Sequence, residues 1–77
     1  MMATQSIDAK GLQCPAPIMR LFNWQKAAQA GDQVSIEATD NGFISDIKAW
    51  CLKTKNELVS LEQKDGVITA IIQKGAG

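Results

Sequence analysis

Two helix-like segments, each preceded by a short strand-like segment, set the strongest limit on what this chain can fold into. The clearer helix runs from Phe43 to Thr54, where apolar side chains recur at helical spacing along one face. The other runs from Pro15 to Ala30 and is expected to end at Gly31, since glycine is typical of helix C-termini. A strand–helix–strand–helix order favours parallel strands joined by right-handed connections.

Four segments have the length and apolar pattern of β-strands. They are Gln5–Ala9, Gln33–Thr39, Glu57–Lys64 and Val67–Gln73. The last two flank Asp65-Gly66, a strong hairpin signal, so the final strand is expected to be antiparallel to the one before it. The pattern therefore predicts an α+β fold with a single domain over residues 1–77. We expect a two-layer α/β sandwich of order βαβαββ, with a four-stranded mixed sheet and both helices on one face.

Composition excludes several classes of function. The chain has 77 residues, eight basic and eight acidic side chains and no histidine. A Cys-His catalytic pair and a histidine-containing metal site are therefore ruled out within it. Arg20 is the only arginine, which disfavours phosphate or nucleic-acid binding. The chain shows no apolar leader and no membrane-length segment, so we expect a cytoplasmic protein. Two cysteines cannot fill a structural zinc site alone, so no metal is expected. We also expect a monomer without a cofactor.

Cys14 is the candidate reactive residue. It lies in the run from Gly11 to Pro17, between the first strand and the first helix. A helix start offers unpaired N–H groups and the positive end of the helix dipole, so a thiol there is expected to be biased toward thiolate. Pro15 and Pro17 suit a first helical turn. The alternative is a buried, inert cysteine.

Cys51 has the opposite character. It falls on the apolar face of the second helix, beside Ile47 and Trp50, and is expected to be a core residue. A redox switch between Cys14 and Cys51 is a further hypothesis, but it requires Cα atoms within about 7 Å of each other.

Met19 and Phe22 lie off the face of the first helix that can pack on the sheet. They are either scattered apolar surface residues or a small docking patch beside the thiol, to which Arg20 would belong. Both interpretations stay open from the sequence.

Five blocks of residues, in order, resemble the TusA/SirA family of small sulfur-carrier proteins over essentially the whole chain. They cover residues 8–19, with the Cys-Pro-x-Pro motif, and residues 31–32, 39–40, 46–51 and 56–58. The resemblance implies a βαβαββ sandwich of strand order 1-2-4-3 with the last strand antiparallel to the rest. It also implies that Cys14 takes persulfide sulfur from a donor protein, such as a cysteine desulfurase or rhodanese, and passes it to an acceptor protein.

The destination that the resemblance implies is tRNA thiouridine, molybdenum cofactor or oxidative sulfur metabolism. Gly11, Pro15, Pro17 and Asp40 are the expected supporting residues. Asp40 should lie near Cys14, because both follow parallel strands whose carboxyl ends share an edge. Its other interpretation is a simple helix N-cap. Asp46 matches a further acidic position of the family and also suits the early turns of its helix electrostatically.

The chain also departs from the family pattern. Phe22 and Asn23 stand where basic residues are frequent, which removes part of the positive charge beside the thiol. Lys55 replaces a frequent glycine after the second helix, so Asn56 is the expected cap there. A non-catalytic interaction or regulatory module, in which the Cys-Pro-x-Pro run serves helix capping and docking, is the competing functional hypothesis.

Overall fold

The computed structural model describes residues 4–75, which form six elements in the expected order. The strands are β1 (Thr4–Ala9), β2 (Gln33–Ala38), β3 (Glu57–Lys64) and β4 (Val67–Gln73), and the helices are α1 (Ala16–Ala27) and α2 (Gly42–Thr54). The two hairpin strands have the bounds that the sequence predicts. The remaining bounds agree within one residue, except at the C-terminal end of α1.

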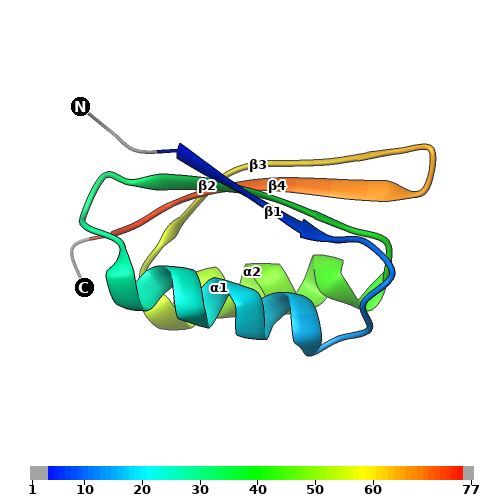
Figure 1. Cartoon of the computed structure of the whole chain (residues 1–77), viewed down its shortest axis with the longest axis horizontal. Coiled ribbons are helices and arrows are strands. Elements are labelled where there is room, and N and C mark those ends of the chain that lie inside the picture. Colours follow the sequence, from blue (N-terminus) through cyan, green and yellow to red (C-terminus); the bar gives the residue numbers. More distant parts are fainter. Residues whose placement is uncertain (1–3, 76–77) are drawn as a thin grey trace.

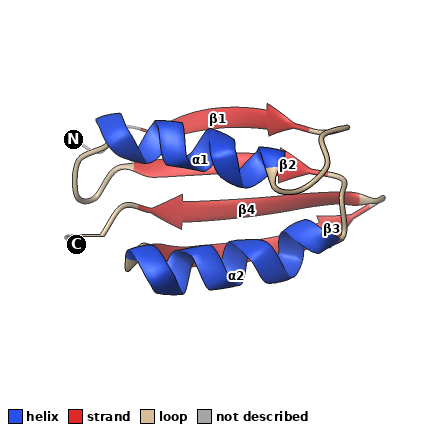
Figure 2. Cartoon of the chain, turned by 90° about the horizontal axis from the view of Figure 1, so that it is seen from below, coloured by secondary structure: helices blue, strands red, loops and turns tan. Residues whose placement is uncertain are grey.

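The sheet has the order β1-β2-β4-β3. β1 pairs in parallel with β2, whereas β4 is antiparallel to both of its neighbours. Figure 1 shows both helices below the sheet, which makes a two-layer sandwich. In Figure 2, α1 lies across β1 and β2, and α2 lies across β3. The predicted α+β fold, with two helices on one face of a mixed sheet, is confirmed.

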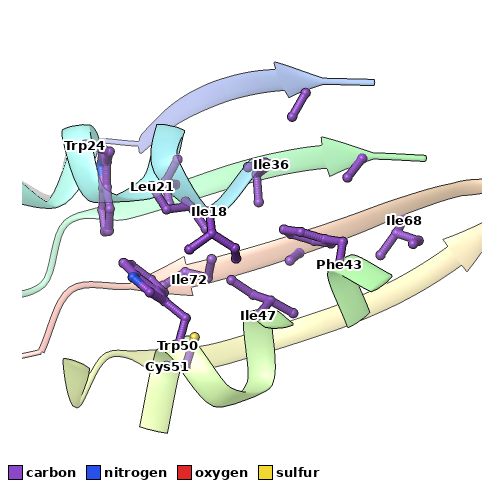
Figure 3. Close-up of a cluster of buried hydrophobic side chains, with 14 residues drawn as sticks. Ile18, Leu21, Trp24, Ile36, Phe43, Ile47, Trp50, Cys51, Ile68 and Ile72 are labelled. Atoms are coloured by element: carbon purple, nitrogen blue, oxygen red, sulfur yellow. The ribbon is translucent and has the colours of Figure 1, made fainter. Parts of the chain in front are cut away.

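The hydrophobic core fills the space between the two layers (Figure 3). Alternate residues of β2 and β4 point into it, in keeping with the two-residue period of a strand. The helices contribute the faces that their periodicity predicts, including Leu21, Phe43 and Ile47, none of which has exposed surface. Within residues 4–75, no helix is long and apolar enough to cross a membrane.

The first helix ends earlier than the sequence predicts. Its last residue is Ala27, not Ala30, and the backbone at Ala28 is already extended. The side chain of Asp32 accepts a hydrogen bond from the Gln29 N–H at 3.0 Å. The Gly31 N–H donates to the Lys74 carbonyl at 2.9 Å, and Gly31 has φ +95°. Gly31 therefore belongs to the turn that leads from α1 into β2, next to the end of β4, and it does not cap the helix.

The end of α2 differs from the expected cap. Lys55, not Asn56, adopts the left-handed conformation, with φ +61°, and its position is the one that glycine favours. Asn56 is buried and makes contacts of a different kind. Its amide nitrogen donates to Gln25 and Thr54, and its oxygen accepts the Gly75 N–H. The Asn56 side chain thus ties α1, the end of α2 and the C-terminal segment together.

Lys55→Gly is expected to raise the free energy of unfolding by about 0.5–1 kcal/mol, because glycine removes the steric cost of a side chain in the left-handed region. Lys53→Gly is the matched control. Lys53 is an exposed residue inside α2, so glycine there should lower stability by about 1 kcal/mol. Urea unfolding followed by tryptophan fluorescence measures both. Equal losses in the two variants would contradict this account of the cap.

Candidate functional site

Cys14 lies at the edge of the sheet where β1 and β2 end. The loop from Lys10 to Pro15 connects β1 to α1, at the right of Figure 1. Gly11 makes the first bend with φ +82°, and its N–H donates to the Thr39 hydroxyl at 2.9 Å. The next turn brings Cys14 to a half-buried position before a cis Cys14–Pro15 peptide bond. The loop is thereby fastened to the residue that follows β2.

Asp40 holds the thiol loop and the start of α2 together. One of its carboxylate oxygens accepts the backbone N–H of Cys14 at 2.8 Å, and the other accepts that of Gly42 at 3.0 Å. These two N–H groups hold the pKa of Asp40 below its ordinary value of 3.8. The expected proximity of Asp40 and Cys14 is therefore found, and Asp40 also serves the first residue of α2, although Asn41 occupies the N-cap position itself.

Asp46 approaches the same thiol from the second turn of α2. A Cβ on Gly42 would lie 4.0 Å from the Cys14 sulfur, so the start of α2 is in close contact with the cysteine. Asp46 follows Gly42 by four residues and therefore lies on the same helix face. Its carboxylate disfavours the anionic form of the thiol and so raises the pKa of Cys14. The sequence alone does not place Asp46 at the site, and its four-residue spacing from Gly42 is the signal that could have done so.

The surroundings of Cys14 disfavour the thiolate that the sequence analysis predicts. Burial of the thiol, followed by hydrogen bonding and charge repulsion from Asp46 and then Asp40, raises the pKa of Cys14 from 9.0 to about 11. The resting side chain is therefore a neutral thiol at pH 7.

The backbone explains why the helix start does not offset the carboxylates. The N–H of Cys14 donates to Asp40, and that of Ala16 donates to the Gln13 carbonyl at 2.8 Å. Pro15 and Pro17 have no N–H to offer. Pro17 lies in the first turn of α1, as expected, and Pro15 is the residue that precedes the helix, but the two prolines also remove two donors that a thiolate would use. Lys10 does not supply the missing charge, because its ammonium pairs with Glu37 at 3.4 Å and Asp8 at 3.7 Å.

Cys51 is a core residue, as its place on the apolar face of α2 predicts. It is 5% exposed, and burial raises its pKa to about 11. Gly42, whose Cβ position lies 4.0 Å from the Cys14 sulfur, precedes Cys51 by nine residues of helix, a rise of about 13 Å. The end of α2 that approaches Cys14 is therefore remote from Cys51. Both cysteines are free, with Cys51 buried in the core and Cys14 half-buried beside the depression, so the structure does not support the hypothesis of a Cys14–Cys51 redox switch.

A polar depression of about 430 Å³ opens beside the thiol. It is lined by Gly11, Leu12, Gln13, Cys14, Thr39 and Asp40. Among residues 4–75, no three metal-ligating side chains come together. The depression gives another molecule access to the sulfur, and its lining contains the Cys14 thiol together with the Asp40 carboxylate.

The candidate docking residues lie on the outer side of α1. Met19 is 57% exposed and Phe22 is 40% exposed, and Arg20 is exposed between them. Phe22 also packs edge-to-face against Trp50 of α2, with ring centroids 5.9 Å apart. Phe22 therefore belongs partly to the contact between the helices, whereas Met19 projects into solvent.

A βαβαββ sandwich with a cysteine at the carboxyl edge of its parallel strands defines a class of small domain. Residues 5–74 match the family described as "Sulfurtransferase TusA". The chain is 36% identical over 70 residues to the sulfur carrier protein TusA of Allochromatium vinosum, with 91% of this chain and 92% of that protein aligned. The chain belongs to the sulfurtransferase TusA family.

Two further comparisons agree. YrkF of Bacillus subtilis is 37% identical over 75 residues, which make up 97% of this chain but 40% of YrkF. The crystal structure of the SirA-like protein from Desulfitobacterium hafniense superposes with a TM-score of 0.80 at 25% identity, over 92% of this chain and 97% of that one. The resemblance read from the sequence is thus confirmed, and none of these findings favours the alternative of a non-catalytic module.

Proposed function

We propose that this protein is a sulfur carrier that takes up a sulfur atom as a persulfide on Cys14 and relays it to an acceptor. Family membership supports the class of activity. The observation that carries the choice of residue is the location of Cys14, half-buried at the mouth of a polar depression, while Cys51 lies in the core.

The chemistry requires little from the protein itself. The Cys14 thiolate attacks the terminal sulfur of the donor's persulfide, so that a new S–S bond forms and the donor's own S–S bond breaks. The donor leaves as a thiolate and takes up the proton that Cys14 lost. The net exchange is Cys14–SH plus R–S–SH giving Cys14–S–SH plus R–SH, without any change in the number of electrons. No histidine is needed for such a step, unlike acyl transfer.

The proposed partners are a donor protein that presents a persulfide and an acceptor protein that receives one. Gly11, Pro15, Pro17 and Asp40 shape and fasten the loop that carries the thiol. Met19, Arg20 and Phe22 form the exposed surface beside it and are the proposed docking residues. Because a half-buried thiol does not protrude, the partner's persulfide must enter the depression.

Cys14→Ser should abolish uptake of the sulfur atom. The protein is incubated with a cysteine desulfurase and cysteine, or with a rhodanese and thiosulfate, and its intact mass is measured. The unaltered protein and Cys51→Ser are expected to gain the mass of one sulfur atom, which dithiothreitol removes. Cys51→Ser is the matched control because it removes the buried thiol. Equal sulfur gain by Cys14→Ser, or no gain by the unaltered protein with either donor, would refute the proposal.

A further inference from the structure

A second hollow lies between the two helices, next to the thiol loop. It measures about 320 Å³ and is predominantly apolar, unlike the polar depression above the sulfur. Its lining includes Pro15, Ile18, Phe22, Asp46, Ala49 and Trp50, and we call it the interhelical groove. A volume of this size accommodates one or two apolar side chains.

The interhelical groove is continuous with the reactive site at one end. Pro15 directly follows Cys14, and Asp46 both lines the groove and interacts with the thiol. Lys53 lines the other end, two helical turns or about 10 Å further along α2. A segment lying in the groove therefore meets a carboxylate where it reaches the sulfur and an ammonium where it leaves.

The floor of the groove contains an unsatisfied polar group. Trp50 is 5% exposed, and its indole N–H is buried without a hydrogen-bond partner among the described residues. Buried donors in native proteins are nearly always paired. The ring of Phe22, 40% exposed, packs edge-to-face against this indole. Trp50, which lines the groove, therefore carries a buried donor whose partner the described residues do not supply.

The charge at the thiol end of the groove is negative. Asp46 of α2 and Asp40, which follows β2, face the sulfur, and within residues 4–75 neither forms an ion pair with a lysine or arginine. Lys10, which follows β1, is engaged by Asp8 and Glu37. From α1 no acidic or basic side chain lines the groove. An approaching cation is attracted here, whereas an anion is repelled.

We propose that the interhelical groove binds a partner segment in which an apolar side chain stands next to a lysine or arginine, close to the sulfur that is exchanged. The apolar side chain occupies the space between Ile18, Phe22 and Trp50, and the cation pairs with Asp46. This inference rests on the proposed function, because it names the chemistry by which the sulfur-exchanging partner is recognised. Pairing with the cation also offsets the negative charge that keeps the Cys14 proton in place, so ionisation follows docking.

Three short peptide disulfides test this selectivity. Each joins thionitrobenzoate to the cysteine of a tripeptide: Leu-Arg-Cys, Leu-Glu-Cys or Gly-Arg-Cys. Cys14 attacks the peptide sulfur, a disulfide forms between protein and peptide, and the coloured thionitrobenzoate anion leaves. Each rate, measured at low salt, is divided by the rate of reduced glutathione with the same peptide, and peptide mapping identifies the modified cysteine. Leu-Arg-Cys should react at least about fivefold faster than either of the other two.

Three variants assign the preference to the groove. Asp46→Asn should remove the preference for arginine over glutamate, and Ala49→Gln, which fills the groove, should remove the preference for leucine over glycine. Leu52→Gln is the matched control, because Leu52 lies on the same helix, is 82% exposed and does not line the groove. It should retain both preferences. Ratios between peptides are compared, so a general change in thiol ionisation cancels.

Equal corrected rates for the three peptides would overturn the inference, as would both preferences surviving in Ala49→Gln and Asp46→Asn. Different results would refute the proposed function and the proposed groove. A protein that gains persulfide sulfur but shows no peptide preference retains its carrier role and loses the proposed groove partner. A protein with the preference but without persulfide uptake retains the groove as a binding site and loses the carrier role.

Discussion

Asparagine in place of Asp46 should shift the pH profile of Cys14 alkylation from a midpoint of about 11 toward the ordinary thiol value of 9.0. The substitution removes a negative charge that repels the thiolate and keeps the shape of the side chain. Each unit by which the pKa falls raises the thiolate fraction at neutral pH about tenfold. Reaction with iodoacetamide, with Cys14 identified by peptide mapping and the pH raised past 11 so that the upper plateau is reached, measures the profile.

The gain in rate at neutral pH is smaller than the gain in thiolate. A less basic thiolate is a weaker nucleophile: the logarithm of its rate constant falls by about 0.4–0.5 for each unit by which its pKa falls. A tenfold larger thiolate population therefore gives about a threefold higher rate of disulfide exchange. Glu57→Gln is the control, since Glu57 is an exposed carboxylate at the start of β3, at the opposite end of the sheet from Cys14. An unchanged midpoint in Asp46→Asn would contradict the contribution of Asp46 and leave burial and Asp40 as the causes of the raised pKa.

A protonated resting thiol is consistent with a carrier that exchanges sulfur only in contact with a partner. Oxidation and disulfide exchange proceed through the thiolate, so a neutral Cys14 is protected while the protein is free. Asp40 contributes to this state while it binds two backbone N–H groups, and it therefore acts on both the structure and the chemistry of the loop. The carboxylates that suppress the reaction in isolation are also the groups that a cationic partner would engage.

The elements with strict periodicity could be predicted from the sequence. The alternation in β2 and the apolar face of α2 each have one interpretation, because their burial follows from local spacing. Asp65-Gly66 forms the predicted hairpin turn, with positive φ at both residues. The proximity of Asp40 to Cys14 follows from topology, since adjacent parallel strands bring their carboxyl ends together.

The features that the sequence did not predict depend on contacts between distant segments. Residues 28–30 have fair helix propensity, but the pairing of Gly31 and Asp32 with Lys74 takes the backbone into the turn before β2. The ionisation of Cys14 depends on Asp46, 32 positions away, and on which N–H groups the loop leaves unused. A helix start favours a thiolate in general, and here two prolines and two carboxylates reverse that preference.

Phe43→Ala should cost about 3–5 kcal/mol in the free energy of unfolding. Phe43 has no exposed surface, and it lies in the first turn of α2, where it packs into the core near Ile36 and Ile68 (Figure 3). Truncation removes its buried surface and leaves a cavity that a close-packed interior does not fill. A domain of this size has about 4–12 kcal/mol of stability in total, so the variant should be close to unfolding at 37 °C.

Phe22→Ala is the matched control, because Phe22 is the other phenylalanine of the chain and is 40% exposed. Its loss should cost about 1 kcal/mol, mainly from the edge-to-face contact with Trp50. Urea unfolding followed by the fluorescence of the two buried tryptophans, Trp24 and Trp50, measures both variants. Equal losses of stability for the two alanine variants would mean that α2 is not held at its N-terminal end by this side chain.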